Sequence, residues 1–201
     1  MTPPPWLPTG GERIGGCFVC FARGGTGPGN AGDPAWAAAA VGGEAVVVRG
    51  EAGAAYEPGL LALREGPLLE AAVRALPWSP DVLLVDGTGR DHPRRAGLAL
   101  HVGAVLAVPT VGITHRPLAA AGEWPADDRG ATSPLLLDGE LVGYWLRTRA
   151  GRRPLAIHAA WRTDPAAAVE VVRASAGAAR TPTPLRRARE AARTARSRSA
   201  T

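Results

Sequence analysis

A short apolar run from Asp81 to Asp86 (DVLLVD) does most to limit how this chain can fold. Four consecutive aliphatic residues between two carboxylates are typical of a strand that is buried on both faces of a parallel sheet. The segment 87–89 (GTG) follows directly and predicts a turn that leaves the Asp86 side chain at the mouth of the sheet. Ligand sites of open α/β sheets lie outside such carboxyl ends, although a turn-forming Asp before Gly also explains this pattern.

The segments on either side of this run differ in pattern. Before it, we expect strands at 15–21, 35–41 and 44–49, which predict an antiparallel meander, and then a helix at 67–76. After it, we expect a helix at 95–106, strands at 108–113, 141–147 and 154–157, and a helix at 164–176. The predicted fold class is therefore α/β, with a mixed sheet (an antiparallel meander plus parallel strands) flanked by helices.

Length and composition favour one globular domain. The chain has 201 residues, of which 46% are hydrophobic and 20% charged, enough to bury a core. We expect a flexible N-terminal segment at 1–13, a domain at 14–178 and a tail at 179–201. The first residues lack the basic and apolar regions of a signal peptide, and no apolar run approaches the roughly 18 residues of a membrane span. We therefore expect a cytoplasmic monomer without membrane contact.

The positive charge is concentrated in the tail. The net charge is +5, and all 23 basic residues are Arg. Residues 180–201 contain seven Arg and one Glu, a charge of +6, so the rest of the chain is close to neutral. A segment rich in Arg, Ala, Ser and Thr is predicted to be disordered or transiently helical, because it lacks a hydrophobic face to bury. Such arms bind phosphate backbones without reading sequence, and an incidental solubilising extension is the alternative.

The two cysteines, Cys17 and Cys20, form a lone CxxC within an apolar stretch. A zinc site would need two more ligands at a recognisable spacing, and none follows. Residues three apart on a strand point to opposite faces, so these thiols do not converge. We interpret them as small buried side chains.

Two carboxylates and one loop carry the candidate chemistry. Asp86 ends the apolar run, and Glu65 follows another apolar stretch in the segment 63–65 (LRE). The loop 91–95 (DHPRR) adds a His and two guanidinium groups, which are well shaped for phosphate oxygens. Such a set suits a hard divalent cation beside a phosphodiester.

The sequence resembles the endonuclease V family in five blocks that keep the family's order and spacing over about residues 14–173. Residues 56–65 (YEPGLLALRE) are similar to the family's YxPGxLxFRE, and 81–94 (DVLLVDGTGRDHPR) to its DxxxxDGxGxxHPR. The remaining blocks are 97–103 (GLALHVG), 109–113 (PTVGI) and 139–149 (GELVGYWLRTR), which resemble GxAxHxG, PTIGV and GxxxGxxxRTR.

The resemblance implies a ribonuclease H-like fold and cleavage one nucleotide 3′ of inosine or a related lesion in DNA or RNA. It implies Mg²⁺ as the cofactor, with Mn²⁺ as a substitute, and it implies Glu65 and Asp86 as catalytic metal ligands. Tyr56 with the Pro58-Gly59 turn matches the wedge inserted where a damaged base leaves the stack, and an edge aromatic packed on the sheet is the alternative for Tyr56. His92 and Arg94 match a phosphate loop. For His101, which follows on a helix, we expect a satisfied core histidine.

The sequence departs from the family at three positions. Phe18 stands where the family's first strand carries a metal-binding Asp, and Asp33, the next acid, is poorly placed to replace it. His115 stands for a Lys. Trp161 stands for a His, with His158 close by in the sequence. A Phe offers no lone pair to a metal, whereas Phe18 and Trp161 could stack on a base.

These departures leave two main functional hypotheses. The first is metal-dependent cleavage of inosine-containing or deaminated nucleic acid, weakened by the lost ligand. The second is a catalytically inactive protein that binds DNA or RNA through the old cleft and the Arg-rich tail. A third is a decayed domain with a protein partner or with no retained activity.

Overall fold

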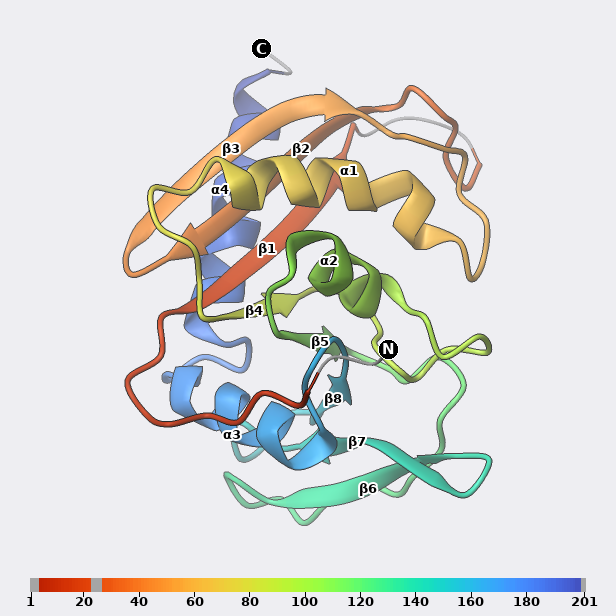
Figure 1. Ribbon diagram of the computed structural model, residues 1–201, viewed down its shortest axis with the longest axis vertical. Coiled ribbons are helices and arrows are strands. Elements are labelled where there is room, and N and C mark those ends of the chain that lie inside the picture. Colours follow the sequence, from red (N-terminus) through yellow and green to blue (C-terminus); the bar gives the residue numbers. More distant parts are fainter. Residues whose placement is uncertain (1–3, 23–26, 200–201) are drawn as a thin grey trace.

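The computed structural model describes residues 4–22 and 27–199, and its centre is an eight-stranded mixed sheet (Figure 1). The strands lie in the order β3-β2-β1-β4-β5-β8-β7-β6. Their bounds are β1 (Ile14–Phe21), β2 (Pro34–Val41), β3 (Glu44–Glu51), β4 (Val82–Val85), β5 (Thr110–Thr114), β6 (Thr132–Leu137), β7 (Glu140–Leu146) and β8 (Leu155–Ala159). The helices are α1 (Leu61–Arg74), α2 (Leu98–Leu106), α3 (Pro165–Ser175) and α4 (Thr183–Arg198).

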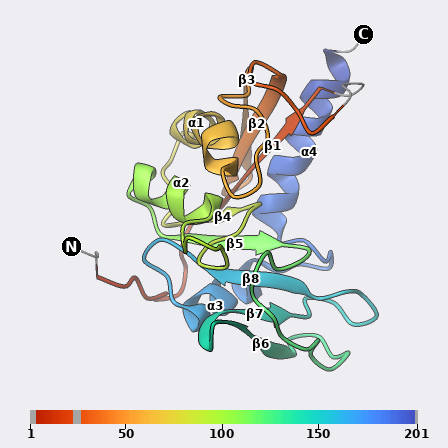
Figure 2. The same cartoon turned by 90° about the vertical axis from the view of Figure 1, so that its right-hand side faces the viewer.

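The pairing of the strands confirms the predicted mixed sheet. β1, β2 and β3 form the antiparallel meander, whereas β1 pairs in parallel with β4 and β4 in parallel with β5. The sheet twists strongly between the meander and the strands β5 to β8 (Figure 2). Because β1, β4 and β5 run in one direction, their carboxyl ends meet at one edge of the sheet.

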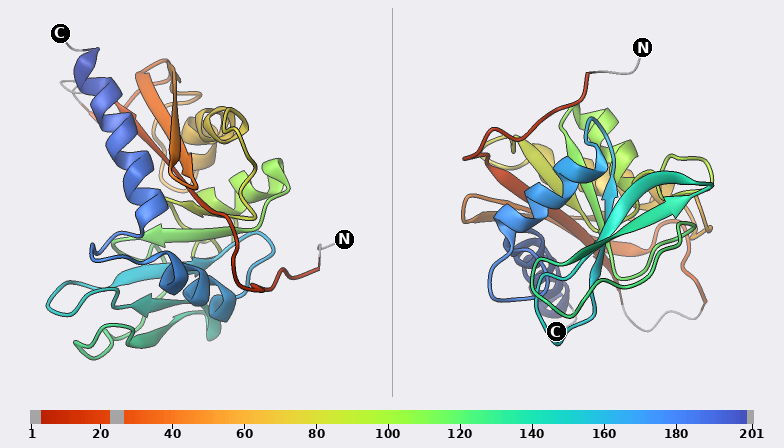
Figure 3. Two further views of the ribbon diagram at one scale, coloured as in Figure 1. Left: turned by 90° about the vertical axis from the view of Figure 1, so that its left-hand side faces the viewer. Right: turned by 90° about the horizontal axis from the view of Figure 1, so that it is seen from below.

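Helices cover both faces of the sheet. On one face, α1 and α2 pack against Leu83 and Val85 of β4, and on the other α3 and α4 pack against Val82 and Leu84 (Figure 3). All four of these β4 side chains are fully buried, as expected for the apolar run. Among the helices of the described residues, none is both long and apolar enough to cross a bilayer.

The buried face predicted for the helix at 67–76 is confirmed, but its start is not. Leu68, Leu69, Ala72, Val73 and Leu76 are all buried. The helix begins at Leu61, so that Pro67 lies inside it rather than in its first turn. Proline disturbs the hydrogen bonds of the preceding turn, and there the carbonyl oxygen of Arg64 accepts from the backbone N–H of Gly53 at 3.1 Å. The sequence also gave no sign of β6, because Pro134 interrupts that edge strand.

The prediction of a disordered tail is wrong for residues 183–198, which form α4 against β1, β2 and β3. The helix buries three small or medium apolar side chains, Leu185, Ala188 and Ala192, at one face. Gly16 makes this contact possible, since a Cβ there would lie 2.5 Å from the backbone nitrogen of Leu185. Opposite α4, β2 presents alanines, so that helix and sheet approach closely. Leu185 and a short face of alanines therefore dock this helix.

The interpretation of the cysteines is confirmed. Cys17 and Cys20 are both buried. Cys17 packs on the α1 side of β1, and Cys20 packs on the α4 side. Their thiols therefore belong to two different apolar clusters.

Leu185→Ala tests whether α4 is docked in solution. Leu185 is completely buried, so we expect this substitution to lower the free energy of unfolding by about 2–5 kcal/mol. Leu7→Ala is the matched control, because Leu7 is 63% exposed, and we expect it to change stability by less than about 0.5 kcal/mol. Urea denaturation measures both, and equal effects of the two substitutions would show that α4 is not packed on the sheet.

Candidate nucleic-acid site at the carboxyl ends of the central strands

A pocket of about 260 Å³ lies where the carboxyl ends of β4 and β5 meet the loop that precedes α1. Asp86 follows β4 and Thr114 ends β5, so the topology of the sheet places both at this edge. The lining residues are Tyr56, Glu57, Pro58, Gly59, Leu61, Ala62, Asp86, Gly87, Thr88, His92, Ala96, Leu98, Thr114 and Leu118. The pocket thus brings together five of the predicted site residues, from segments some 30 residues apart in the sequence.

The Pro58-Gly59 turn is fixed to the loop that carries His92 and Arg94. The backbone N–H of Arg94 donates to Nδ1 of His92 at 3.1 Å, which leaves the proton on Nε2. That Nε2 and the Nη2 of Arg94 both donate to the carbonyl oxygen of Gly59, at 3.1 and 2.8 Å. Gly59 has a φ of +79°, a conformation that favours glycine. His92 and Arg94 therefore position the turn beside Tyr56, whose side chain is 44% exposed.

Asp91 and His158 form a buried polar group beneath this loop, and sequence reasoning assigned no role to either. The Asp91 carboxylate accepts from the backbone N–H groups of Leu118, Ala119 and Ala120 at 2.6–2.8 Å. His158 Nδ1 lies 3.6 Å from that carboxylate, and its Nε2 lies 2.8 Å from Oγ1 of Thr114. Burial lowers the pKa of His158 to about 4, although Asp91 acts in the opposite direction. The imidazole is therefore neutral at pH 7, and Asp91 holds the loop at the far wall of the pocket.

The Asp86 side chain is paired with a cation from α4. Nη2 and Nε of Arg189 donate to Oδ2 of Asp86 at 2.9 and 3.2 Å. The side chain of Asp86 is 26% exposed and that of Arg189 is 13% exposed. The guanidinium also lies over the ring of Phe18, 5.6 Å from its centroid, and Arg193 lies over the same ring at 5.3 Å. Phe18 therefore packs under two arginines of α4 and does not line the pocket.

Glu65 lies close to Asp86 on the α1 side of the site. Its burial raises the pKa to about 8, and the negative charge of Asp86 raises it further, whereas Arg64 lowers it. The two carboxylates are thus close enough to influence one another electrostatically. Burial and the charge of Asp86 both favour the protonated form of Glu65.

Other predicted residues lie away from the pocket. Trp161 lies beyond the end of β8, which is antiparallel to β5, so it lies near the start of β5. Its side chain packs against Gly103 of α2, away from the end of β5 that borders the pocket. Asp33 is paired with Arg64 at 2.7 Å. The prediction of a core histidine at position 101 is wrong, because His101 is exposed on α2 and covers Gly66 instead of entering the core.

His115 lies at the rim of the site. Partial desolvation lowers its pKa, the positive charges of Arg180 and Arg189 lower it further, and Asp86 raises it. Arg180 is itself held by the carbonyl oxygens of Arg153 and Pro154 at 2.6 and 2.8 Å. The rim therefore contains two permanent cations beside a neutral imidazole, an arrangement that suits an anion.

The residues present do not fit the divalent cation that the resemblance implies. Within the described ranges, no group of three or more His, Cys, Asp or Glu side chains is arranged to hold a metal ion. Asp86 already has Arg189 as its partner, and Phe18, which the resemblance aligns with a metal-binding Asp, has no atom that can bind a metal. A guanidinium in this position supplies the charge that a cation would bring.

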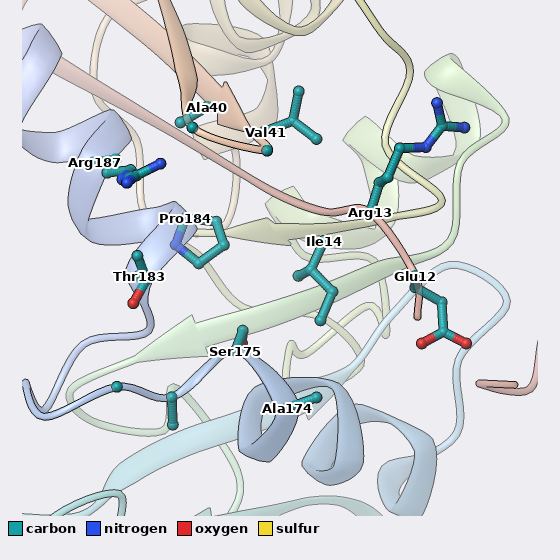
Figure 4. A pocket seen from close by; sticks show the side chains of 14 residues that line it. Glu12, Arg13, Ile14, Ala40, Val41, Ala174, Ser175, Thr183, Pro184 and Arg187 are labelled. Atoms are coloured by element: carbon teal, nitrogen blue, oxygen red, sulfur yellow. The ribbon is translucent and has the colours of Figure 1, made fainter. Parts of the chain in front are cut away.

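A second cavity, of about 520 Å³, lies beside the start of α4 (Figure 4). It is lined by the start of β1, the end of β2, the end of α3 and the first turn of α4 with Arg187. Glu12 and Arg13 point away from one another at its rim (Figure 4). This cavity contains none of the predicted site residues.

The fold and the site together define the class of protein. A mixed sheet with an antiparallel meander, parallel central strands and helices on both faces is a ribonuclease H-like fold, as in the endonuclease V from Streptomyces avermitilis. That crystal structure superposes with a TM-score of 0.81 and 33% identity over 100% of this chain and 86% of that one. The endonuclease V from Ciona intestinalis, solved with a DNA that contains inosine, gives a TM-score of 0.78 at 18% identity over 93% of this chain and 86% of that one.

Sequence comparison agrees with the fold. A family model described as Endonuclease V matches residues 36–190. The endonuclease V of Methanopyrus kandleri is 47% identical over 111 residues, 55% of this chain and 48% of that protein. The chain thus matches about half the length of such curated relatives. It belongs to the endonuclease V family.

The buried His158 predicts a dependence of stability on acid. Its folded pKa of about 4 is below the unfolded value of about 6.5, so the unfolded chain binds the extra proton between these values. We therefore expect its contribution to the free energy of unfolding to fall by roughly 2 kcal/mol from pH 6.5 to pH 4.5. Urea denaturation of the wild type and His158→Gln over this range measures the difference. Identical pH dependence in both proteins would contradict a neutral buried imidazole.

Proposed function

We propose that this protein binds nucleic acid that contains inosine or another deaminated base, and that it does so without metal-dependent cleavage. The base enters the pocket beside Tyr56, and the adjoining phosphate lies against Arg189 at the rim. The observation that carries the proposal is the ion pair between Arg189 and Asp86 at 2.9 Å. It gives the site a built-in cation at the position where cleavage would need a metal.

The pocket supports the binding half of the proposal. Its volume of about 260 Å³ is just below the roughly 300–1,000 Å³ usual for ligand sites, which favours one planar base over a larger group. Its walls combine the apolar side chains of Leu61, Ala62 and Leu98 with polar groups at Asp86 and Thr88. Tyr56 stands at the entrance with a rigid turn behind it, as extrusion of a base requires. The Ciona intestinalis member of the family was solved with inosine-containing DNA.

The proposed binding of the adjoining phosphate depends on the positive charges at the rim of the pocket. Arg189 uses Nε and Nη2 for Asp86, and Nη1 lies 3.3 Å from the hydroxyl of Thr181. Arg180 and His115 lie close enough to influence one another electrostatically. An approaching phosphate therefore meets the guanidinium groups of Arg189 and Arg180, cations of the kind on which nucleic-acid affinity depends.

A second candidate function is the weakened nuclease, with Glu65 and Asp86 as the ligands of a single Mg²⁺ or Mn²⁺. The observation in its favour is the closeness of these two carboxylates, since Asp86 raises the pKa of Glu65. Under this alternative, Arg189 must leave Asp86 before a metal binds. The two functions therefore predict opposite effects of substitutions at Asp86 and Arg189.

Asp86→Asn and Arg189→Met separate the two functions. If the protein only binds, Asp86→Asn frees Arg189 to contact the phosphate, so we expect affinity for the oligonucleotide to stay the same or increase. Arg189→Met removes one charge-assisted hydrogen bond to the phosphate, so we expect it to weaken binding about tenfold. Fluorescence anisotropy with a single-stranded inosine oligonucleotide measures both, and a matched adenine oligonucleotide is the control. Gels with Mg²⁺ or Mn²⁺ at high protein concentration test cleavage. Product formation that disappears in Asp86→Asn would establish the nuclease and refute the proposal.

A metal titration tests whether Arg189, by pairing with Asp86, prevents a divalent metal from binding. We expect 5–10 mM Mn²⁺, roughly the range in which weak single-carboxylate sites fill, to leave the melting temperature of the wild type unchanged. The double substitution Phe18→Asp with Arg189→Ala restores a second ionised carboxylate and removes the competing cation. We expect Mn²⁺ to raise its melting temperature by a few degrees, about 1 kcal/mol of stability. Phe18→Asp alone is the control, because Arg189 and Arg193 remain beside the new carboxylate. Stabilisation of the wild type by Mn²⁺ would contradict the proposal.

A further inference from the structure

A groove of about 570 Å³ lies between the last turns of α4 and the strands β2 and β3, outside the pocket described above. Its lining residues are Ala22, Pro34, Trp36, Arg49, Arg193, Arg196, Ser197 and Ser199. Three of them are arginines, and none is acidic. In the part of the chain that the structure describes, no carboxylate pairs with Arg49, Arg193 or Arg196. The groove thus holds three cations that lack an internal counter-charge.

These guanidinium groups are held in place by rings and by a backbone carbonyl. Arg49 lies over the Trp36 ring at 5.7 Å, and Arg193 lies over the Phe18 ring at 5.3 Å. Nη1 of Arg196 donates to the carbonyl oxygen of Phe21 at 3.2 Å. Contacts of this kind orient an arginine without neutralising it, so most of its five N–H donors stay available to an anion.

Another hollow, of about 270 Å³, shares a lining residue with the groove and one with the base pocket. Tyr56 lines both the base pocket and this hollow, and Ala22 lines both the hollow and the groove. On the α4 side, Arg189, Arg193 and Arg196 are four and three residues apart and therefore share one side of the helix over about 10 Å. A row of cations thus runs from Asp86 at the pocket to Trp36 in the groove.

We propose that Arg49, Arg193 and Arg196 bind the phosphates of one nucleic-acid strand that leaves the base pocket past Tyr56. This inference rests on the proposed function, since it takes the base pocket as the other end of the strand. The size of the groove fits a single strand, whereas a duplex would touch only its rim. The spacing of cations along a helix face suits the regular charge of a phosphate backbone.

Charge reversal on one side of α4 tests the groove. Arg193→Glu with Arg196→Glu places two negative charges in it. Arg187→Glu with Arg198→Glu is the matched control, because both arginines are exposed and project from the opposite side of the same helix. The ligands are a trinucleotide with a central inosine and a single-stranded 20-mer with inosine near one end, in both orientations. Anisotropy at several salt concentrations gives the affinity and its salt dependence.

We expect the wild type to bind one orientation of the 20-mer more tightly than the trinucleotide. The variant Arg193→Glu with Arg196→Glu should bind the 20-mer at least about tenfold more weakly. The slope of its log binding constant against log salt concentration should become shallower by about 1.4, because each of two lost phosphate contacts contributes about 0.7. Its affinity for the trinucleotide should stay unchanged. The control should lose less than about threefold. Equal losses in the two variants would overturn the groove and leave only diffuse attraction to a basic helix.

Arg49→Glu on β3 provides an independent measurement, because it changes the groove without touching α4, and we expect the same selective loss. Competition by polyglutamate as effective as that by an oligonucleotide of equal charge would overturn the choice of a nucleic acid. A 20-mer bound no more tightly than the trinucleotide would overturn the groove but not the base pocket. A trinucleotide that fails to bind, with a 20-mer still sensitive to Arg193 and Arg196, would support the groove and refute the proposed function.

Discussion

The contact between Arg189 and Asp86 joins the last helix to the end of the central strand, and the character of the site depends on it. The pair lies largely out of solvent, with side chains 13% and 26% exposed, so the charges are screened less than on the surface. An ion pair of this kind adds little net stability, because desolvation of both groups offsets much of the attraction. Its importance is geometric. It fixes a positive charge of α4 beside Asp86, a carboxylate that lines the pocket.

This contact is possible only because helix and sheet approach closely. Gly16 on β1 and the alanines of β2 leave room for the backbone of α4, and Leu185, Ala188 and Ala192 meet them without large side chains. The long arginine stems then cover the remaining apolar surface, above all the ring of Phe18. The same helix therefore closes the core on one side and presents cations on the other.

The sequence predicted the elements whose signal is local. The apolar run at 82–85, the Asp164 cap, which accepts from the N–H of Ala167 at 2.7 Å, and the alternation of Cys17 and Cys20 all depend on neighbouring residues. Pro67 misled the prediction because the turn that contains it is supported from outside, by Gly53. α4 was missed for a similar reason. Its face of alanines is too weakly apolar to stand out, and it becomes a packing surface only opposite Gly16 and the alanines of β2.

For the site, the sequence identified the residues of the pocket but not what they contact. Asp86 and His92 were identified from the apolar run and the loop after it, and Tyr56 and Gly59 from the family pattern, and all four line one pocket. Their partners come from segments that no local pattern connects.

The partner of Asp86 is 103 residues away, and the three N–H groups that hold Asp91 come from a loop nearly 30 residues further along. The structure also adds to the interpretation of Phe18. From the sequence, Phe18 is only the position at which an expected metal ligand is lost. Under Arg189 and Arg193, it is the surface on which two guanidinium groups rest.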